Sequence, residues 1–264
     1  MIGNKSLFLG AAIIILFTFM ALAAPFLTEY EPALIDGSNL LMPPSARHLL
    51  GTDSLGRDLA SRIFYGARIS LSIGILAVGV ATVLGVFFGS LAAFYGGILD
   101  SLLMRLVDIM LCFPTFYLIL GIAAITQPSV FNIVLIIGLT SWMQPARLIR
   151  SEILSLKERE FIQAAKAIGA SNMRIILRHL LPNALGPVLV NATLGIGGAI
   201  MVESGLSFLG LGVQPPIPSW GNILMESKST LGVAWWITVF PGLAILITIL
   251  GFNFLAEGLK KKIG

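Results

Sequence analysis

Few residues of this chain are able to do chemistry, and two acids inside apolar segments are the most informative of them. A carboxylate at the centre of a bilayer costs on the order of 3 kcal/mol, so such a residue tends to be retained for a reason. Asp108 follows Arg105 by three residues, a spacing that predicts an ion pair on one helix face. Glu203 has no basic residue within a helical turn. Two interpretations of Glu203 stay open: it meets a cationic group in a water-filled pathway, or it pairs with a basic residue of a partner chain.

The other reactive side chains do not form a set. His48 and His179 fall in loops that we assign below to opposite sides of a membrane, and Cys112 lies in an apolar run, where a small buried side chain is expected. The sequence contains no G-x-x-x-x-G-K-[ST] loop, which excludes ATP binding by that motif. We therefore expect no catalysis, no metal site and no cofactor bound by this chain.

The elements that carry these residues are predicted to be apolar helices. Of the 264 residues, 56% are hydrophobic and 11% charged, against roughly 45–50% and about 25% in a typical soluble domain. The apolar residues form long unbroken blocks, which favours transmembrane helices over a β-barrel. Spans of about 20 residues are predicted over 7–27, 70–94, 102–125, 130–148, 187–211 and 233–256, six in all. The first is longer than the core of a signal peptide, so we expect an uncleaved anchor.

The basic residues predict how these spans are oriented. Twelve of the 17 Lys and Arg residues fall on one side of the alternating spans and five on the other. Basic residues collect in cytoplasmic loops of membrane proteins. Both termini and the 149–186 loop are therefore expected in the cytoplasm, with loops 28–69 and 212–232 outside.

Prolines interrupt three of the predicted spans, at Pro114, Pro145 and Pro241. Two interpretations stay open, because proline is tolerated where neighbouring helices satisfy the freed carbonyl and also kinks helices that line a pathway. No internal repeat is visible, which weakens the case for an inverted-repeat secondary transporter.

The 147–187 stretch is too long for a plain connection and is patterned as two short helices. Apolar residues recur at helical spacing between Leu156 and Gly169, and Gly169 is a plausible stop. A second helix is predicted over Asn172–Leu181, with Ser171 as N-cap and Pro182 closing it. A projecting pair of short helices, with small residues on the first, would enter a groove on another protein. The alternative is an interfacial helix lying on anionic lipid.

The spacing of this stretch resembles the EAA loop of ABC-importer permeases. Gln163-Ala164-Ala165 is followed after six positions by Gly169, and Leu181-Pro182 begins twelve positions later. The resemblance implies a coupling helix seated in a cleft of a cytoplasmic ATPase. Gln163 stands where the motif has an acid, and Glu160 lies one turn earlier. The implied ATPase-coupling residues are Glu160, Gln163, Ala164, Ala165, Gly169, Ala170, Leu181 and Pro182.

A second set of motifs resembles the C-type permeases of dipeptide, oligopeptide and nickel importers. It begins with Leu50-Gly51-Thr52-Asp53-Ser54-Leu55-Gly56-Arg57-Asp58 and continues through Leu206-Ser207-Phe208-Leu209-Gly210 and Pro241-Gly242-Leu243-Ala244. Thr52, Asp53, Arg57 and Asp58 are expected to form a charge-paired turn leading into an amphipathic segment over 59–68. The extracytoplasmic signature Gly51, Thr52, Asp53, Gly56, Arg57 and Asp58 is either a local brace or a docking surface for a substrate-binding protein.

The resemblance implies an all-α membrane protein with the type I ABC-importer permease fold. Residues 1–69 would be an anchor and outer loop, and 70–264 a five-helix permease core with both termini cytoplasmic. It implies a B-type permease as heterodimer partner, two ATPase subunits that bind ATP-Mg, an extracytoplasmic substrate-binding protein, and the inner membrane as location. Candidates for the translocation path are then Glu203, Asp108 and Pro114.

The substrate class stays open within this resemblance. Di- and oligopeptides are the first interpretation, and nickel or another metal chelate and glutathione are the alternatives. An ion-coupled secondary carrier is the alternative class. It is disfavoured because such a carrier would want several intramembrane acids, and only Asp108 and Glu203 are available. A membrane enzyme would need a cluster of His, Asp, Glu or Cys at one depth, and nucleic acid is not an expected partner.

Overall fold

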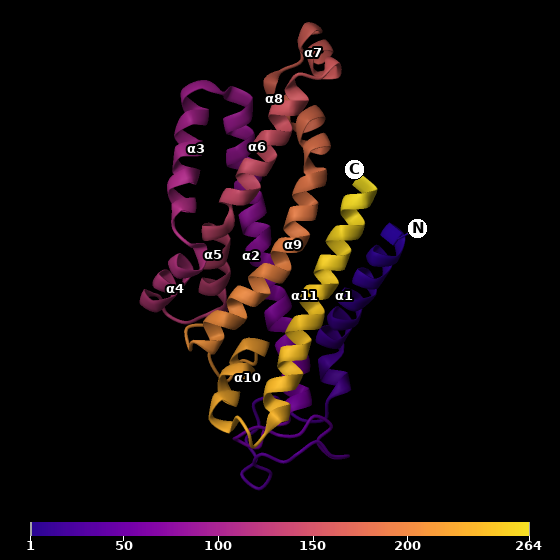
Figure 1. Cartoon of the computed structure of the whole chain (residues 1–264), viewed down its shortest axis with the longest axis vertical. Helices are drawn as coiled ribbons and strands as arrows, with labels where there is room; N and C mark the ends of the chain where they lie inside the picture. Colours follow the sequence, from indigo (N-terminus) through magenta and orange to yellow (C-terminus); the bar gives the residue numbers. More distant parts are fainter. Residues whose placement is uncertain (1, 264) are drawn as a thin grey trace.

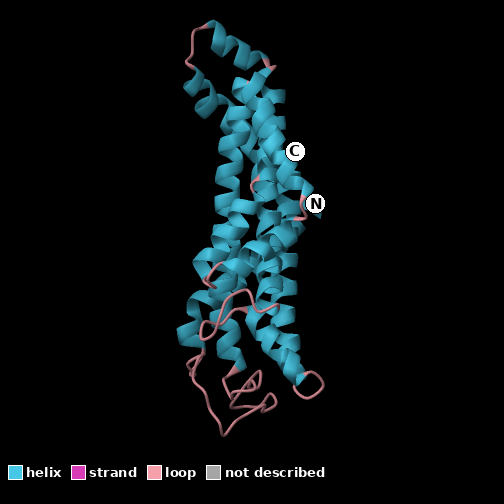
Figure 2. Ribbon diagram, turned by 90° about the vertical axis from the view of Figure 1, so that its left-hand side faces the viewer, coloured by secondary structure: helices cyan, strands magenta, loops and turns pink. Residues whose placement is uncertain are grey.

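The computed structural model of the chain describes residues 2–263 as an elongated bundle of helices (Figure 1). Four long helices form its body: α1 (Ile2–Leu27), α2 (Leu59–Tyr95), α9 (Leu181–Phe208) and α11 (Trp235–Ile263). Both termini lie side by side and point toward one end of the bundle. Most of the irregular chain gathers at the other end (Figure 2).

Helix α2 begins eleven residues before the span predicted to start at 70, so that start is wrong. Asp58 is the N-cap, and its Oδ2 accepts hydrogen bonds from Ser61 N at 2.8 Å and Ser61 Oγ at 2.9 Å. This cap satisfies an orphan donor of the first turn. The segment expected to be amphipathic over 59–68 is therefore continuous with the span. At 1.5 Å per residue the 37 residues extend about 55 Å, well beyond a hydrocarbon core of about 30 Å.

Glycines bring α1 and α11 into close contact. A Cβ atom at Gly10 would lie 2.4 Å from Leu255 N, and one at Gly258 would lie 2.5 Å from Leu7 Cβ. A Cβ at Gly251 would lie 2.6 Å from Ile13 Cγ2. Small residues allow this approach, which is how helices gain packing energy in lipid. The N-terminal helix is thereby fixed along the C-terminal one.

The predicted single span over 102–125 is broken in the structure. It consists of α3 (Gly97–Cys112) and α4 (Thr115–Ile125), which are bent by 82° relative to each other. Pro114 is the N-cap of α4. The physical reason is that proline disfavours a helical conformation in the residue before it, and Phe113 is indeed extended, with ψ 131°.

The span predicted over 130–148 appears as α5 (Val130–Ser141) followed at once by α6 (Met143–Lys157). Helix α5 has 12 residues, fewer than a helix needs to cross a bilayer. Within 2–263, four helices are long and apolar enough to span a membrane, or up to five if α3 and α4 make one span. The six predicted spans therefore do not all correspond to separate long helices. The span predicted over 130–148 is not one long apolar helix, because polar residues follow soon after Ser141.

The loop beyond α6 forms α7 (Glu160–Ala167) and α8 (Asn172–Arg174), at the end of the bundle toward which the termini point (Figure 1). A π-helical segment, Ile175–Leu180, then joins α8 to α9 without interruption. The prediction that Pro182 closes a helix is wrong. Pro182 lies inside a helix that continues from Asn172 to Phe208, directly after the π-helical segment, where the regular i→i−4 hydrogen bonds are already interrupted. At the opposite end lie α10 (Trp220–Glu226) and a 3₁₀ turn, Ser227–Thr230.

Candidate functional site

Helix α7 presents one face to the bundle and one to its surroundings. Ile162 and Ala165 are buried. Ile162 belongs to a buried cluster that also contains Ile153, Ile175 and Leu180. Glu160, Gln163 and Ala164 are exposed on the other faces. The predicted amphipathic helix therefore exists, although the two alanines differ in burial.

The exposed side of α7 borders a concave surface. A cavity of about 570 Å³ is lined by Ala164, Ala165, Gly169, Ala170 and further residues of the loop, among them Phe161, Ile168, Arg174, Arg178 and His179. Ile168 is 85% exposed. An exposed apolar residue beside small residues and two arginines is typical of a surface that meets another protein. The geometry therefore fits docking of a partner.

Gly169 ends α7 as predicted. Its φ is +78°, a conformation in which an L residue is strained. Gly169 N donates to Lys166 O at 3.0 Å and Ala170 N donates to Ala165 O at 3.0 Å, which is the Schellman pattern. Gln163 Nε2 donates to Lys157 O at 2.9 Å, which ties α7 back to the end of α6. The turn fixes the direction in which α7 leaves the bundle.

Leu181 and Pro182 lie at the start of α9. Leu181 is half-buried and packs against the cluster beneath α7, whereas Pro182 is exposed. The structure therefore places both near the loop but outside the concave surface of α7.

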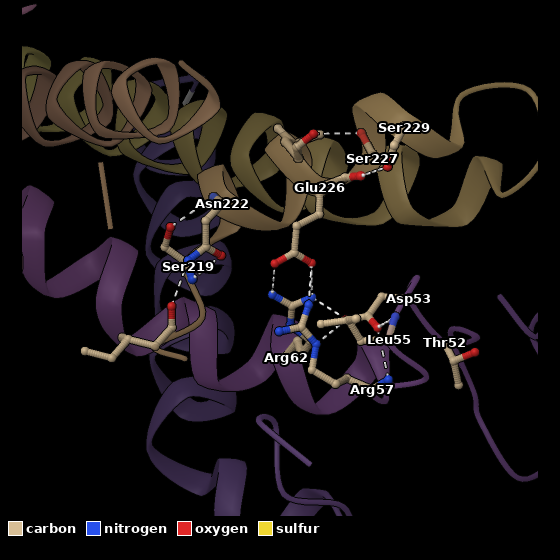
Figure 3. A network of polar contacts seen from close by, with 12 residues as sticks. Thr52, Asp53, Leu55, Arg57, Arg62, Ser219, Asn222, Glu226, Ser227 and Ser229 are labelled. Atoms are coloured by element: carbon tan, nitrogen blue, oxygen red, sulfur yellow. Dashed lines mark hydrogen bonds and ion pairs between the residues drawn. The ribbon is translucent and has the colours of Figure 1, made fainter. Parts of the chain in front are cut away.

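At the opposite end, four charged side chains form a buried network (Figure 3). Arg57 Nε donates to Asp53 Oδ2 at 2.7 Å, and Arg57 Nη2 donates to Glu226 Oε2 at 2.7 Å. Arg62 pairs with the same two acids, donating from Nη2 to Glu226 Oε1 at 2.9 Å and from Nη1 to Asp53. The predicted charge-paired turn is confirmed, and the network extends it to α10.

Two glycines shape the turn that carries this network. Gly51 and Gly56 have φ values of +82° and +76°. A Cβ at Gly56 would lie 1.8 Å from Asp36 O, so only glycine fits there. Thr52 and Asp58 form an isolated antiparallel bridge. His48 Nδ1 lies 2.9 Å from Asp58 Oδ1, and both side chains are buried. Internal contacts thus connect the signature residues to one another and to the loop around them.

Glu203 is fully buried among serines, with 0% of its surface exposed. Its Oε1 accepts from Ser207 Oγ at 2.7 Å and from Ser219 Oγ at 2.9 Å. Its Oε2 lies 3.5 Å from Ser70 Oγ and 3.4 Å from Ser204 Oγ. Within this chain the carboxyl group is held by serine hydroxyls, and both interpretations of Glu203 stay predictions. The carboxyl group joins α9, α2 and the start of α10.

Asp108 pairs with Arg147 of α6 rather than with Arg105, so the predicted pairing within one helix is corrected. One turn further along α6, Arg150 donates from Nε and Nη2 to the two carboxylate oxygens of Asp100 of α3, at 2.6 Å each. These two pairs connect α3 to α6. Tertiary packing placed a basic residue of α6 beside each acid, which the local spacing on α3 did not reveal.

Two cavities follow one face of α9. The first, about 390 Å³, lies between α2, α5, α6 and α9, and the second, about 580 Å³, lies between α6, α9 and α11. Asn191 and Leu194 line both. The hollow therefore continues from the middle of the bundle toward the end that carries α7.

Sequence reasoning missed several residues of these sites. Glu226 lies 164 residues from Arg62, and no spacing signal connects them. Gln144 and Asn191, which line the first cavity, look in sequence like ordinary polar residues of a helix. The only available signal was that both are uncharged polar residues in or next to predicted spans.

Solved structures share the fold of this chain. The chain superposes on a chain of the MetNI methionine ABC transporter in an inward-facing conformation, with a TM-score of 0.62 at 19% identity, covering 75% of this chain and 94% of that one. A second crystal form gives a TM-score of 0.59 at 22% identity. The fold is that of a permease of an ABC importer.

The chain belongs to the family of binding-protein-dependent transport system inner membrane components, which matches residues 85–264. Residues 2–44 match the N-terminal TM domain of oligopeptide transport permease C. The resemblance to C-type permeases is thereby confirmed.

Three relatives span nearly the whole chain. It is 46% identical over 257 residues to the dipeptide transport system permease protein DppC of Alkalihalophilus pseudofirmus, covering 97% of this chain and 84% of that protein. It is 40% identical to the di/tripeptide transport system permease protein DppC of Pseudomonas aeruginosa, covering 97% and 87%. It is 37% identical to the oligopeptide transport system permease protein OppC of Bacillus subtilis, covering 98% and 85%.

Proposed function

We propose that this chain is one of two permease subunits of an ATP-driven importer of di- and oligopeptides. The observation that carries the proposal is α7, a short helix at one end of the bundle with an exposed concave surface beside Ala164 and Gly169. A subunit of the importer family that has no phosphate-binding loop must receive its energy through contact with another protein. The names of the relatives described above refer to transport of dipeptides, of di- and tripeptides or of oligopeptides. These names support peptides as the substrate class.

The proposed topology has six membrane crossings and both termini in the cytoplasm. In it α3 with α4 makes one crossing, and α5 with the first part of α6 makes another. The distribution of Lys and Arg supports this orientation. So does the position of the termini, which point toward the end that carries α7 (Figure 1). Residues 1–69 would form the anchor and outer loop, with the core following from 70 to 264.

The proposed assembly contains three kinds of partner protein. A homologous B-type permease would complete the pathway, and two ATPase subunits would bind ATP-Mg and receive α7. Glu160 and Gln163 at the exposed start of α7 would contact the ATPase, with Ala164 allowing close approach. A substrate-binding protein would deliver peptide to the outer end, above the Asp53–Arg57–Arg62–Glu226 network.

The proposed mechanism is a rigid-body change driven from α7. Closure of the ATPases on ATP would displace α7, and the uninterrupted helix from Asn172 to Phe208 would transmit that displacement into the bundle. The cavities along α9 would open alternately to the two sides. In this scheme Asp108 connects α3 to α6, and Pro114 sets the bend between α3 and α4.

Reconstituted transport tests this function. The chain is expressed with its partner permease, ATPases and binding protein, and the complex is placed in liposomes that contain ATP. Uptake of radiolabelled dialanine that requires ATP and the binding protein is the expected result. Uptake of nickel chelate or glutathione in place of peptide would overturn the substrate class. Uptake by the chain alone, driven by an ion gradient, would overturn the importer assignment.

A further inference from the structure

We propose that Gln144 of α6 and Asn191 of α9 form a carboxamide site that binds the backbone of a peptide in transit. The inference rests on the proposed function and names the chemistry by which the pathway accepts many peptides. It starts from the 390 Å³ cavity in the middle of the bundle, whose volume falls within the range of about 300–1,000 Å³ usual for small-molecule sites.

The polar lining of this cavity carries no charge. Its polar side chains are Thr82, Ser141, Gln144 and Asn191, and the other lining residues are small or aliphatic. Gln144 is exposed and Asn191 is half-buried, so both amides are reachable from the hollow they line. A charged lining would favour peptides of one charge, whereas a neutral polar lining does not discriminate in that way.

These four side chains have no hydrogen-bond partner among residues 2–263. Some polar side chains of the same helices are satisfied internally, whereas Ser90 Oγ of α2 is not. Thr140 Oγ1 donates to Ile136 O at 2.6 Å, and Thr193 Oγ1 donates to Leu189 O at 2.8 Å. Thr82 Oγ1 is buried without a partner, which is costly in a membrane bundle. The other three side chains are open to the hollow, where a ligand would supply hydrogen-bond partners.

The peptide unit is the ligand that such groups match. A carboxamide offers two N–H donors and one carbonyl acceptor, and each peptide unit offers one donor and one acceptor in return. Because every peptide has these groups whatever its side chains, binding through them would serve a broad range of peptides.

The position of Asn191 supports a place on the path of transport. Asn191 also lines the 580 Å³ cavity, which continues toward the α7 end and is bordered by Glu152 and Lys260. A peptide held at Gln144 and Asn191 would therefore move next into a space lined by one acid and one base. Asn191 lies at the junction of the two spaces.

Uptake of dialanine and of dilysine by the complete complex tests the inference. The variants are Gln144→Leu and Asn191→Leu, which keep side-chain size and remove the amide, and Asn191→Gln, which keeps an amide. The matched control is Asn253→Leu on α11, where an exposed asparagine lies outside both cavities. Assembly of each complex is checked by the amount of ATPase that copurifies.

We expect each leucine variant to take up dialanine and dilysine about tenfold more slowly than wild type, with the same factor for both dipeptides. The glutamine variant is expected to recover part of the lost uptake. Asn191→Asp is expected to shift the uptake ratio toward dilysine, which a merely structural role of Asn191 would not do. Normal uptake by the assembled leucine variants would overturn the inference while leaving the proposed function in place. A wild-type complex that transports neither dipeptide would overturn both.

Discussion

Arg62 in the first turn of α2 and Glu226 at the end of α10 form a two-pronged ion pair across 164 residues of sequence, with Arg62 Nη2 2.9 Å from Glu226 Oε1. The side chain of Arg62 is 3% exposed and that of Glu226 14%. Arg57 and Asp53 complete the network. The loop before α2, α2 itself and α10 are thereby held together at one end of the bundle.

Glu226→Ala is expected to destabilise the complex, because it leaves two buried guanidinium groups to share the single carboxylate of Asp53. Removing one member of a buried pair costs about 3–5 kcal/mol, so the Tm of the purified complex should fall by several degrees. Differential scanning fluorimetry in detergent measures this. Glu257→Ala is the control, since it removes the exposed pair with Lys261, worth about 0–1 kcal/mol. An equal fall in both variants would contradict the role of the network.

Ala164→Arg is expected to release the ATPase, because a long charged side chain would fill the concave surface beside α7. Ala167→Arg places the same side chain on an exposed position of α7 that does not line this surface. Copurified ATPase and peptide-stimulated ATP hydrolysis are the measurements. We expect the first variant to lose at least tenfold in both and the second to remain near wild type. If the two variants behave alike, α7 does not dock through this surface.

Gly169→Ala is expected to weaken coupling without unfolding the bundle. A residue with a Cβ in the left-handed region costs roughly 1–2 kcal/mol, and Gly169 has a φ of +78°. The strain would loosen the Schellman turn and increase cleavage of the α7 loop in limited proteolysis. Gly121→Ala, with open space around the new Cβ, is the control. Unchanged cleavage and unchanged uptake in Gly169→Ala would show that the turn does not set the position of α7.

Glu203→Gln is expected to keep uptake within about twofold, because an amide oxygen can still accept from Ser207 and Ser219. Glu203→Leu leaves those buried hydroxyls without acceptors, at about 1–3 kcal/mol each, and should lower the Tm of the complex. Comparing the two variants separates an effect of Glu203 on the stability of the complex from an effect on transport. A glutamine variant with normal Tm but no uptake would instead indicate that Glu203 acts in the translocation pathway.

Local patterns predicted the features that local chemistry decides. The stop at Gly169 follows from the freedom of glycine at positive φ, and the Asp53–Arg57 pair follows from four residues of separation within one turn. The family resemblance came from motifs whose order extends over most of the chain.

Features that depend on tertiary packing were not predictable in this way. The i,i+3 spacing of Arg105 and Asp108 permits an ion pair, but the packing of α3 on α6 supplied Arg147 instead. Glu203 had no visible partner because its hydroxyl donors come from three separate segments, including Ser70, which is 133 residues away. Pro182 looked like a helix stop, because the π-helical turn that carries the chain into α9 has no simple sequence signal.

The serine cluster around Glu203 also determines where α9 can turn. The uninterrupted helix that begins at Asn172 is anchored near its far end, where Glu203 accepts from Ser219 and contacts Ser70 of α2. At 1.5 Å per residue, the distance from Asn172 to Glu203 is about 45 Å. A tilt of about 5° around that anchor would displace the α7 end by about 4 Å while hardly moving the outer end. In the proposed mechanism the cluster would therefore act as the pivot of this helix, and a displacement applied at the α7 end would be largest there and smallest near Glu203.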